Sequence, residues 1–208
     1  MASGQTHYEE RLHDAVFSVA SPSFFQVNTK QAERVFDLVR EALALTGSET
    51  VVDAFAGVGT FAVLLAPHAK RIIAIEDSAP AVADAQRNAE ALPPELSRKI
   101  EFRQGRTEDV LQTLVDEHIE AVVLDPPRAG CAPEALQALI AAAPRRIAYV
   151  SGDPETLARD LKVLTAGPFR IERVQPVDMF PQTYHTECVV TLTSDDAKRA
   201  SLALRQHL

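Results

Sequence analysis

The chain has 208 residues, of which 46% are hydrophobic and 24% are charged, so it can form one sizeable core with at most a small appendage. No apolar run approaches the ~20 residues that a membrane-spanning helix needs, and the polar N-terminus is unlike a secretory signal. The only two cysteines, Cys131 and Cys188, exclude a disulfide framework and have no partners at zinc-ligand spacing. We therefore expect a cytoplasmic protein with no membrane association and no bound metal.

The formal net charge is −8 and the isoelectric point is about 5.3. Most nucleic-acid binders carry a positive field instead, because phosphate contacts supply much of their affinity. Basic residues gather here only in local pairs, which are typical of a solvated surface: Arg145 with Arg146, Arg170 with Arg173, and Lys198 with Arg199. Composition alone thus predicts weak, salt-sensitive RNA binding by the isolated chain.

Helix-like and strand-like stretches alternate along the chain. Apolar residues recur at helical spacing in residues 27–45, and further helices are predicted over residues 79–92, 107–117, 133–143 and 154–166. The predicted strands cover residues 50–56, 71–77, 99–104, 121–125, 146–151, 169–177 and 188–193. Several have continuous apolar cores, as in TVVDAFA and AVVLDPP, and such cores are typical of strands buried on both faces of a parallel sheet.

This alternation predicts an α/β fold with a doubly wound, mostly parallel seven-stranded sheet and right-handed crossovers. Pro168 and Pro176 indicate an edge or a bend near the last two strands. We expect an N-terminal extension over residues 1–16, one domain over residues 17–193, and a C-terminal tail over residues 194–208. The tail has room for a short helix, and no function is assigned to it.

The strongest local signal is VVDAFAGVGTFA, residues 51–62, in which a strand leads through Gly57 and Gly59 into the start of a helix. Glycine permits the tight turn and lets a ligand approach the backbone closely. Open α/β sheets bind their ligands at this carboxyl edge. A tight turn with no ligand is the alternative interpretation of the pattern.

Glu76 ends the second strand, 19 residues after Gly57 (76 − 57). An acidic residue at about this spacing typically accepts hydrogen bonds from ribose hydroxyl groups. Both NAD and S-adenosylmethionine contain a ribose, and Gly57, Gly59 and Ala62 also fit the spacing of a dinucleotide-binding motif. A second feature must therefore separate these two ligands.

The segment Asp125-Pro126-Pro127-Arg128 follows the fourth strand and is predicted to stand at the same edge as the glycine loop. A carboxylate and a rigid Pro-Pro turn can form a wall between a cofactor and a substrate, and a dehydrogenase has no need of this element. The segment therefore favours S-adenosylmethionine, with a Pro-rich turn of no functional meaning as the alternative.

Five motifs now occur in an order that resembles a known family. They are FFQVN (residues 24–28), DAFAGVGTF (53–61), DPPRAG (125–130), YVSGDPETLARDL (149–161) and DMFPQTYHTECV (178–189). Together they resemble the RNA (uracil-5-)-methyltransferases, which make 5-methyluridine in transfer or ribosomal RNA, over residues 17–193. The resemblance implies the Rossmann-like fold of the class I S-adenosylmethionine-dependent methyltransferases.

The resemblance also implies roles for individual residues. Gln26, Phe55, Gly57, Gly59 and Thr60 would line the cofactor pocket, although Thr60 stands where many relatives have asparagine. The ribose hydroxyl groups would bind to Glu76, in agreement with the spacing argument.

Two acidic residues would lie where the cofactor meets the target base, Asp125 as a cofactor-binding residue and Glu187 as the catalytic one. Asp125 would lie beside the methyl donor and the target base. Glu187 would be the general base that removes the proton from carbon 5 of uracil. A glutamate on a surface strand, with no catalytic role, is the alternative for Glu187.

The chain departs from the family pattern in two ways. The family's nucleophile is a cysteine in a Ser-Cys-Asn/Asp-Pro motif, and Gly152 takes its place in Ser151-Gly152-Asp153-Pro154. Relatives also commonly carry an RNA-binding β-barrel domain before the catalytic part, for which there is no room ahead of Phe17. We therefore expect RNA binding to need an additional domain.

The missing cysteine matters because carbon 5 of uracil is a poor nucleophile until a thiolate attacks carbon 6. Cys131 follows DPPRAG and could replace it, whereas Cys188 should point away from its neighbour Glu187. A buried, structural thiol is the simpler interpretation of both cysteines.

Three hypotheses remain open. The first is an RNA 5-methyluridine methyltransferase, and the second is a module that binds S-adenosylmethionine but has lost uracil methylation. The third, a dinucleotide-dependent oxidoreductase, is the least favoured.

Overall fold

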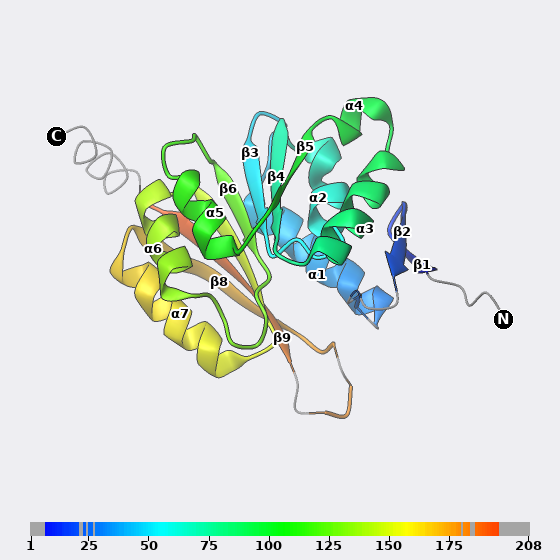
Figure 1. The fold of residues 1–208 in the computed structure, drawn as a ribbon. Helices are drawn as coiled ribbons and strands as arrows, with labels where there is room; N and C mark the ends of the chain where they lie inside the picture. Colours follow the sequence, from blue (N-terminus) through cyan, green and yellow to red (C-terminus); the bar gives the residue numbers. More distant parts are fainter. Residues whose placement is uncertain are drawn as a thin grey trace.

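The computed structural model of the chain describes residues 7–20, 23, 25, 26, 28–179, 181–183 and 186–195. Within them, seven strands form one sheet in the order β5-β4-β3-β6-β7-β9-β8 (Figure 1). The strands are β3 (Thr50–Ala54), β4 (Arg71–Glu76), β5 (Ile100–Gln104), β6 (Ala121–Leu124), β7 (Arg146–Ser151), β8 (Phe169–Val177) and β9 (Glu187–Ser194). Strands β5, β4, β3, β6 and β7 run parallel, and β9 is antiparallel to β7 and β8. The predicted mostly parallel, seven-stranded α/β sheet is therefore confirmed.

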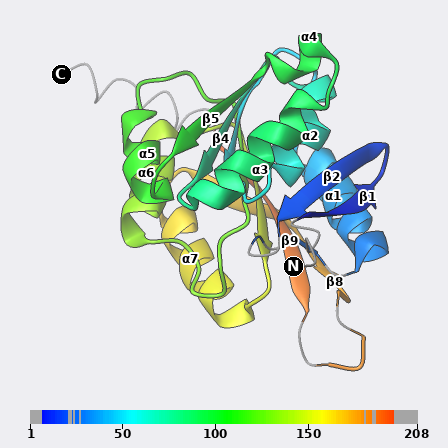
Figure 2. The same cartoon turned by 45° about the vertical axis from the view of Figure 1, so that its right-hand side comes forward.

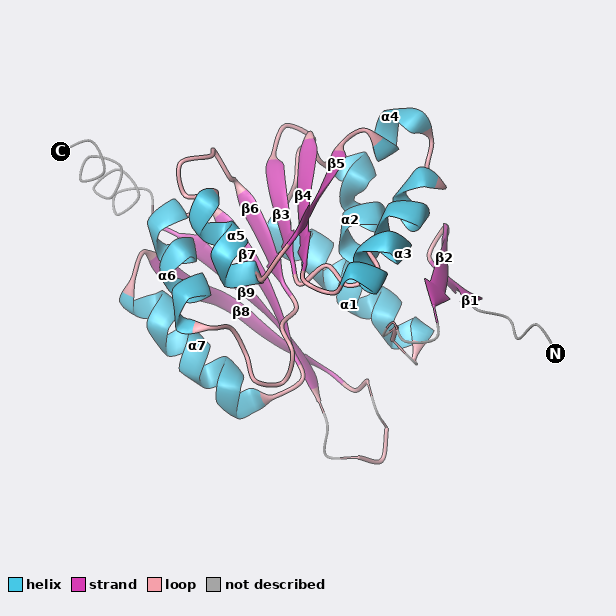
Figure 3. Cartoon of the chain, viewed as in Figure 1, coloured by secondary structure: helices cyan, strands magenta, loops and turns pink. Residues whose placement is uncertain are grey.

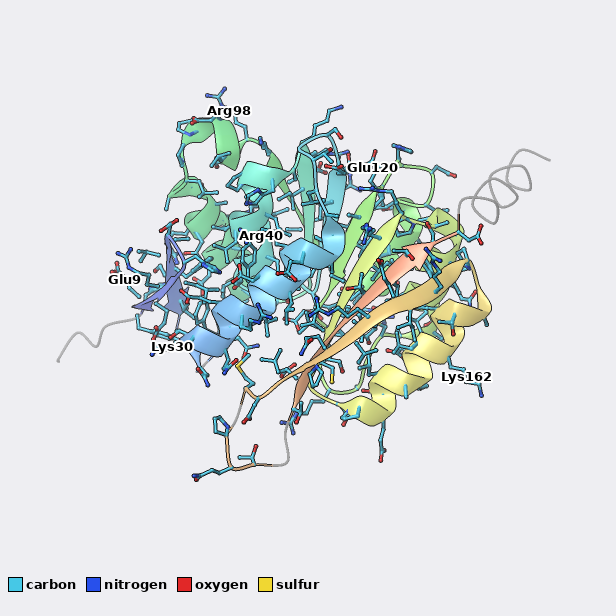
Figure 4. All side chains as sticks on the ribbon, turned by 180° about the vertical axis from the view of Figure 1, so that it is seen from behind. Glu9, Lys30, Arg40, Arg98, Glu120 and Lys162 are labelled. Atoms are coloured by element: carbon cyan, nitrogen blue, oxygen red, sulfur yellow. The ribbon has the colours of Figure 1, made fainter. Side chains whose placement is uncertain are left out.

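Helices cover both faces of this sheet (Figure 3). One face carries α1 (Thr29–Leu43), α2 (Thr60–Leu65) and α3 (Ala79–Glu90), with a 3-10 turn (Ala66–His68) and the short α4 (Pro94–Ser97) at its edge. The opposite face carries α5 (Thr107–Thr113), α6 (Pro133–Ala142) and α7 (Pro154–Ala166). Seen from behind, α1 runs diagonally across the sheet (Figure 4). In the part of the chain that is described, no helix is long and apolar enough to cross a membrane.

The core lies on both sides of the sheet because successive strand residues point to opposite faces. Val51 and Ile72 belong to the cluster packed against α1 and α2. Their neighbours Val52 and Ile73 belong to the cluster packed against α5, α6 and α7. This double burial explains why the strands are continuous apolar runs.

A hairpin that the sequence analysis did not predict precedes the sheet. It consists of β1 (His7–Leu12) and β2 (Ala15–Ala20), which pair antiparallel. The hairpin packs against α1 and α3 (Figure 2). It buries Leu12, Phe17 and Val19 in a third apolar cluster. The expected boundary between residues 16 and 17 falls inside β2, and the division into domains stays a prediction.

The ends of several elements differ from the predictions. The strand expected over residues 50–56 ends at Ala54, because Phe55 adopts a left-handed backbone with φ 66° and begins the glycine turn. Pro176 lies in β8, the strand at one edge of the sheet, as predicted. Ser194 still belongs to β9, whereas residues 196–208, most of the expected tail, lie outside the described residues.

This topology makes a testable distinction between a central strand and an edge strand. Ile73 is completely buried in β4, so Ile73→Ala should leave a cavity and lower the free energy of unfolding by about 2–5 kcal/mol. Ile171 is 44% exposed on β8, so Ile171→Ala should change it by less than about 1 kcal/mol. Urea denaturation measures both, and equal losses would contradict the strand order.

Candidate active site

A cavity of about 620 Å³ opens at the carboxyl edge of the sheet. The ends of β3, β4, β6 and β7 meet at this edge, and so does the start of the antiparallel β9. Phe55, Glu76, Asp125, Gly152 and Glu187, which stand at or next to these strand ends, all line the cavity. It is therefore the ligand site that an open α/β sheet is expected to have.

The glycine loop forms the floor of the cavity. Phe55, Gly57 and Gly59 have φ angles of 66°, 53° and 82°, so the chain turns through three left-handed residues between β3 and α2. A left-handed non-glycine residue costs about 1–3 kcal/mol and is typical of functional sites. Phe55, Gly57 and Thr60 line the cavity.

Gly59 was expected to line the cofactor pocket, but it does not line the cavity. It packs beneath the loop, where an added Cβ would lie 3.1 Å from the Cβ of Ala85 on α3. Its left-handed φ and this close approach explain the glycine without a ligand. Gly59 therefore shapes the loop from behind.

Glu76 ties the glycine loop to the neighbouring strand. One carboxylate oxygen accepts a hydrogen bond from the Gly57 N–H at 2.8 Å, and the other accepts one from the Ser78 N–H at 2.9 Å. Burial raises the pKa of Glu76, and these two N–H donors act in the opposite direction. Each carboxylate oxygen still has a second lone pair for a ligand hydroxyl group.

A further carboxyl group, that of Asp53, interacts with both Glu76 and Asp125. Asp53 is completely buried, accepts the Ala62 N–H at 2.9 Å through Oδ2, and has no hydrogen-bond partner for Oδ1 within the described part of the chain. Burial raises the pKa of Asp53 to about 8, and Asp125 and Glu76 add to the rise. Asp53 was not predicted as a site residue, although an acidic residue near the end of a buried strand is a signal for one.

Asp125, Gly152 and Glu187 line the part of the cavity next to the ends of β6, β7 and β9. Burial, with a contribution from Glu187, raises the pKa of Asp125 to about 7. Burial also raises the pKa of Glu187, and the nearby Arg128 opposes that rise. A positively charged ligand group at this end of the cavity would favour the ionised form of both carboxyl groups.

Gly152 faces Glu187 directly. A Cβ at residue 152 would lie 2.8 Å from Oε1 of Glu187, which is the far end of a flexible side chain. The φ of Gly152 is outside the left-handed region, so the backbone can accept a side chain. The absent side chain thus leaves space that Glu187 occupies.

Cys131 does not reach the cavity. It is buried in the core beside α6, and its thiol lies 3.6 Å from the Tyr149 hydroxyl. Burial raises the pKa of Cys131 to about 12, which makes its thiol a poor nucleophile at neutral pH. The structural interpretation of Cys131 is favoured, and a substitute nucleophile must be sought elsewhere.

Side chains of α7 form hydrogen bonds with the loop of residues 125–130 and with Cys131, which follows it. Asp160 is completely buried and accepts the Cys131 N–H at 2.8 Å and the Tyr149 hydroxyl at 2.7 Å. The Thr156 hydroxyl donates to the Arg128 carbonyl at 2.9 Å. These contacts fix the wall that carries Asp125.

The first motif, residues 24–28, reaches the cavity through Gln26. Its side-chain oxygen is buried and has no hydrogen-bond partner among the described residues, although Gln26 lines the cavity. Asn28 caps α1 and donates to the carbonyl of Met179, 151 residues away, at 3.1 Å. Two distant motifs therefore meet at one wall, while Phe24, Phe180, Tyr184 and His185 lie outside the described residues.

Seven of the eight predicted site residues thus line one cavity, and Gly59 is the exception. Their roles in binding and catalysis stay predictions. Among the described residues there is no group of three or more potential metal ligands. Sequence reasoning missed two contributors: Asp53, which begins the motif DAFAGVGTF but was given no role, and the hairpin with Leu12, which contains none of the five motifs.

The raised pKa of Asp125 leads to a pH-dependence test. In the folded chain the Asp125 carboxyl group keeps its proton up to a pH of about 7, whereas in the unfolded chain it loses this proton near pH 4. The stability of the native chain relative to Asp125→Asn should therefore fall as pH rises through this window, because asparagine cannot ionise. We expect the free energy of unfolding of Asp125→Asn, relative to that of the native chain, to be at least about 1 kcal/mol higher at pH 8 than at pH 5. Urea denaturation at the two pH values measures this difference. An identical difference at both pH values would contradict the burial of this carboxyl group.

Comparisons with known proteins point to one family. The model of the tRNA (uracil-5-)-methyltransferase family matches residues 9–195. An uncharacterised RNA methyltransferase of Synechocystis is 46% identical over 191 residues, and one of Oceanobacillus iheyensis is 40% identical over 192 residues. Each alignment covers 91% of this chain but only 40% and 41% of the respective relative. The chain thus spans about two fifths of the length of these relatives.

Solved structures show the same fold. The tRNA (uracil-54, C5)-methyltransferase of Pyrococcus abyssi, determined with S-adenosyl-L-homocysteine, matches with a TM-score of 0.75 and 34% identity, over 91% of this chain and 45% of its own. A tRNA m1G37 methyltransferase of M. jannaschii matches in fold alone, with a TM-score of 0.66 and 16% identity, over 93% of this chain and 58% of its own. The fold is the Rossmann-like fold of the class I methyltransferases, and the chain belongs to the tRNA (uracil-5-)-methyltransferase family.

Proposed function

We propose that this chain binds S-adenosylmethionine and forms the methyl-transfer unit of an RNA methyltransferase of the uracil-5 type. The observation that carries this proposal is the acidic cavity at the carboxyl edge of the sheet. Glu76, Asp125 and Glu187 line it, and Arg128 is the one cationic side chain among its described lining residues. S-adenosylmethionine carries a sulfonium and an ammonium group, and this charge pattern suits both.

The same charges disfavour a dinucleotide. The pyrophosphate of NAD carries negative charge and would be placed among carboxylate groups in a partly buried cavity. Like charges at short distance in such surroundings cost several kcal/mol. The oxidoreductase hypothesis therefore has no support from the cavity.

The residues present fit the cofactor. Glu76 has lone pairs for the ribose hydroxyl groups, and the unpartnered oxygen of Gln26 can accept an N–H of the ligand. The backbone of Gly57 allows close approach. When bound, the cofactor supplies an electrophilic methyl group.

Glu187 is suited to the role of general base. Burial raises its pKa, and a carboxylate with a pKa nearer neutrality is a more effective proton acceptor at pH 7. Asp125 lines the same cavity, and the repulsion between the two negative charges hinders the ionisation of Asp125 and Glu187 at the same time. We infer that Glu187 accepts the carbon-5 proton and that Asp125 holds the reacting groups between the cofactor and the base.

Gly152 supports a second candidate, a module that binds S-adenosylmethionine without methylating uracil. The thiolate route needs a bond from sulfur to carbon 6 of the ring, and glycine has no side chain to form it. Cys131 is buried away from the cavity and does not replace it. The thiolate route is therefore closed in this chain unless the RNA reaches another nucleophile.

RNA is the proposed substrate, and its binding is proposed to need an additional RNA-binding domain. The net charge of −8 supports this, because the isolated chain lacks the positive field that holds phosphates. We also propose a cytoplasmic location, which agrees with two free cysteines in the described chain.

Calorimetry tests the cofactor. The native chain should bind S-adenosylmethionine and S-adenosylhomocysteine more tightly than NAD. Glu76→Ala should weaken binding by roughly 1.5–3 kcal/mol, because hydrogen bonds to a charged group are lost. Tighter binding of NAD would refute the proposed function.

Covalent trapping tests the role of Gly152. In the presence of S-adenosylmethionine, a thiolate bonded to carbon 6 of 5-fluorouridine in RNA would let carbon 5 take the methyl group. Carbon 5 then carries fluorine and no proton for the base to remove, so the thiolate stays bonded to carbon 6. Intact-mass spectrometry should show no adduct with the native chain and an adduct with Gly152→Cys, since only the flexible Glu187 side chain must move aside.

Cys131→Ser is the matched control, because it removes the thiol that was the candidate substitute nucleophile. An adduct of the native chain that Cys131→Ser abolishes would show that the thiolate route is open here. Adduct formation by Gly152→Cys also separates the two candidate functions: it requires RNA to enter the cavity, which a pure cofactor-binding module has no need to allow.

A further inference from the structure

One face of α3 touches two walls of the cavity. Asp84 and Asn88 are one helical turn apart, and their residues are 1% and 3% exposed. Ala85, between them, is completely buried and is the residue against which Gly59 packs. None of these three residues lines the cavity itself.

Asn88 joins the hairpin to the glycine loop. Its side-chain oxygen accepts the Ser18 N–H of β2 at 2.8 Å. Its side-chain nitrogen donates to the Val58 carbonyl at 3.0 Å, in the middle of the glycine loop. A single amide therefore spans two segments that are 40 residues apart (58 − 18).

Asp84 holds the exit of the hairpin. Oδ2 accepts the Ala20 N–H at 2.9 Å and the Ser23 hydroxyl at 2.7 Å. Oδ1 accepts from Arg87, one turn further along α3, at 2.8 Å. The buried carboxylate is thus satisfied by the segment that leads from β2 towards Gln26.

Both tethered segments contribute to the cavity. Leu12, Ser23, Phe25 and Gln26 line it from the hairpin side, and Gly57 and Val58 line it from the loop side. An error of about 1 Å in the placement of such groups can cost about 100-fold in function. The separation of these two walls therefore depends on the α3 face.

We propose that Asn88 and Asp84 are positioning residues, which hold the hairpin and the glycine loop at the separation that the cofactor requires. The proposal rests on the proposed function, because it names the cofactor as the ligand whose affinity is set in this way. It assigns the hairpin a role as a fixed wall of the cofactor pocket.

The test compares two variants of Asn88 with a control. Asn88→Ala removes both contacts, whereas Asn88→Asp keeps an acceptor for the Ser18 N–H and loses the donor to the Val58 carbonyl. Each should raise the Kd for S-adenosylhomocysteine at least tenfold by calorimetry. Leu139→Ala is the control, since Leu139 is buried in the core on the other face of the sheet and should lower Tm without changing the Kd.

Hydrogen exchange without ligand gives the second readout. Asn88→Ala should speed exchange at the Ser18 and Ala20 amides and at the Gly57–Gly59 amides together, whereas Asn88→Asp should affect mainly the loop. Asn88→Ser replaces Asn88→Ala if the alanine variant does not fold.

The outcomes separate the two proposals. If the native chain does not bind S-adenosylhomocysteine, the proposed function fails, and hydrogen exchange alone decides whether α3 couples the walls. If the native chain binds and both Asn88 variants bind equally well, the positioning role is overturned. A loss of affinity in Leu139→Ala as large as in Asn88→Ala would also overturn it, because general destabilisation would then explain the effect.

Discussion

Glu76 accepts the N–H groups of Gly57 and Ser78 through its two carboxylate oxygens, and the geometry of the site depends on this contact. The contact joins the end of β4 to the turn that follows β3. It can form because neighbouring parallel strands end at the same edge of the sheet. The glycine loop is thereby held open towards the cavity, where Gly57 and Val58 form part of the lining.

The same edge gathers carboxyl groups that are costly to bury. Asp53 and Asp125 have raised pKa values of about 8 and about 7, chiefly because they are removed from water. A fold keeps such groups when something offsets the cost, since buried charges are normally paired. In the described residues the unpartnered Oδ1 of Asp53 receives no such compensation from the protein. A cationic ligand above the glycine loop would favour the ionised form of the carboxyl groups that line the cavity, such as Glu76 and Asp125.

Parts of this arrangement could be predicted from the sequence because they depend on local rules. Continuous apolar runs identified the strands of the sheet, and the spacing from Gly57 to Glu76 placed an acidic group beside the loop. The hairpin was missed because β1, HYEERL, contains few apolar residues, and its stability comes from tertiary contacts with Asp84 and Asn88 of α3. The ligand-binding role of Gly59 stays a prediction, because spacing alone does not distinguish a glycine that faces a ligand from one that faces a helix. The exclusion of Cys131 from the cavity likewise needed the three-dimensional path of the loop after Asp125.

Gly152 shows how one residue separates binding from chemistry in this fold. The backbone around it is compatible with a side chain, and the space is occupied by Glu187. The residues proposed to bind the cofactor lie at β3, β4 and the segment after the hairpin, so cofactor binding is expected to survive in a chain that lacks the nucleophile. On the proposed function, the cofactor and the reacting base would then occupy different ends of one cavity.

If one cavity holds the cofactor with its reacting end at Asp125, Gly152 and Glu187, a crystal structure of the chain with S-adenosylhomocysteine should show it. We expect ligand density in the cavity, with the ribose hydroxyl groups within hydrogen-bonding distance of Glu76 and the sulfur near Asp125. Density for the ligand outside this cavity, or a ribose bound away from Glu76, would contradict it.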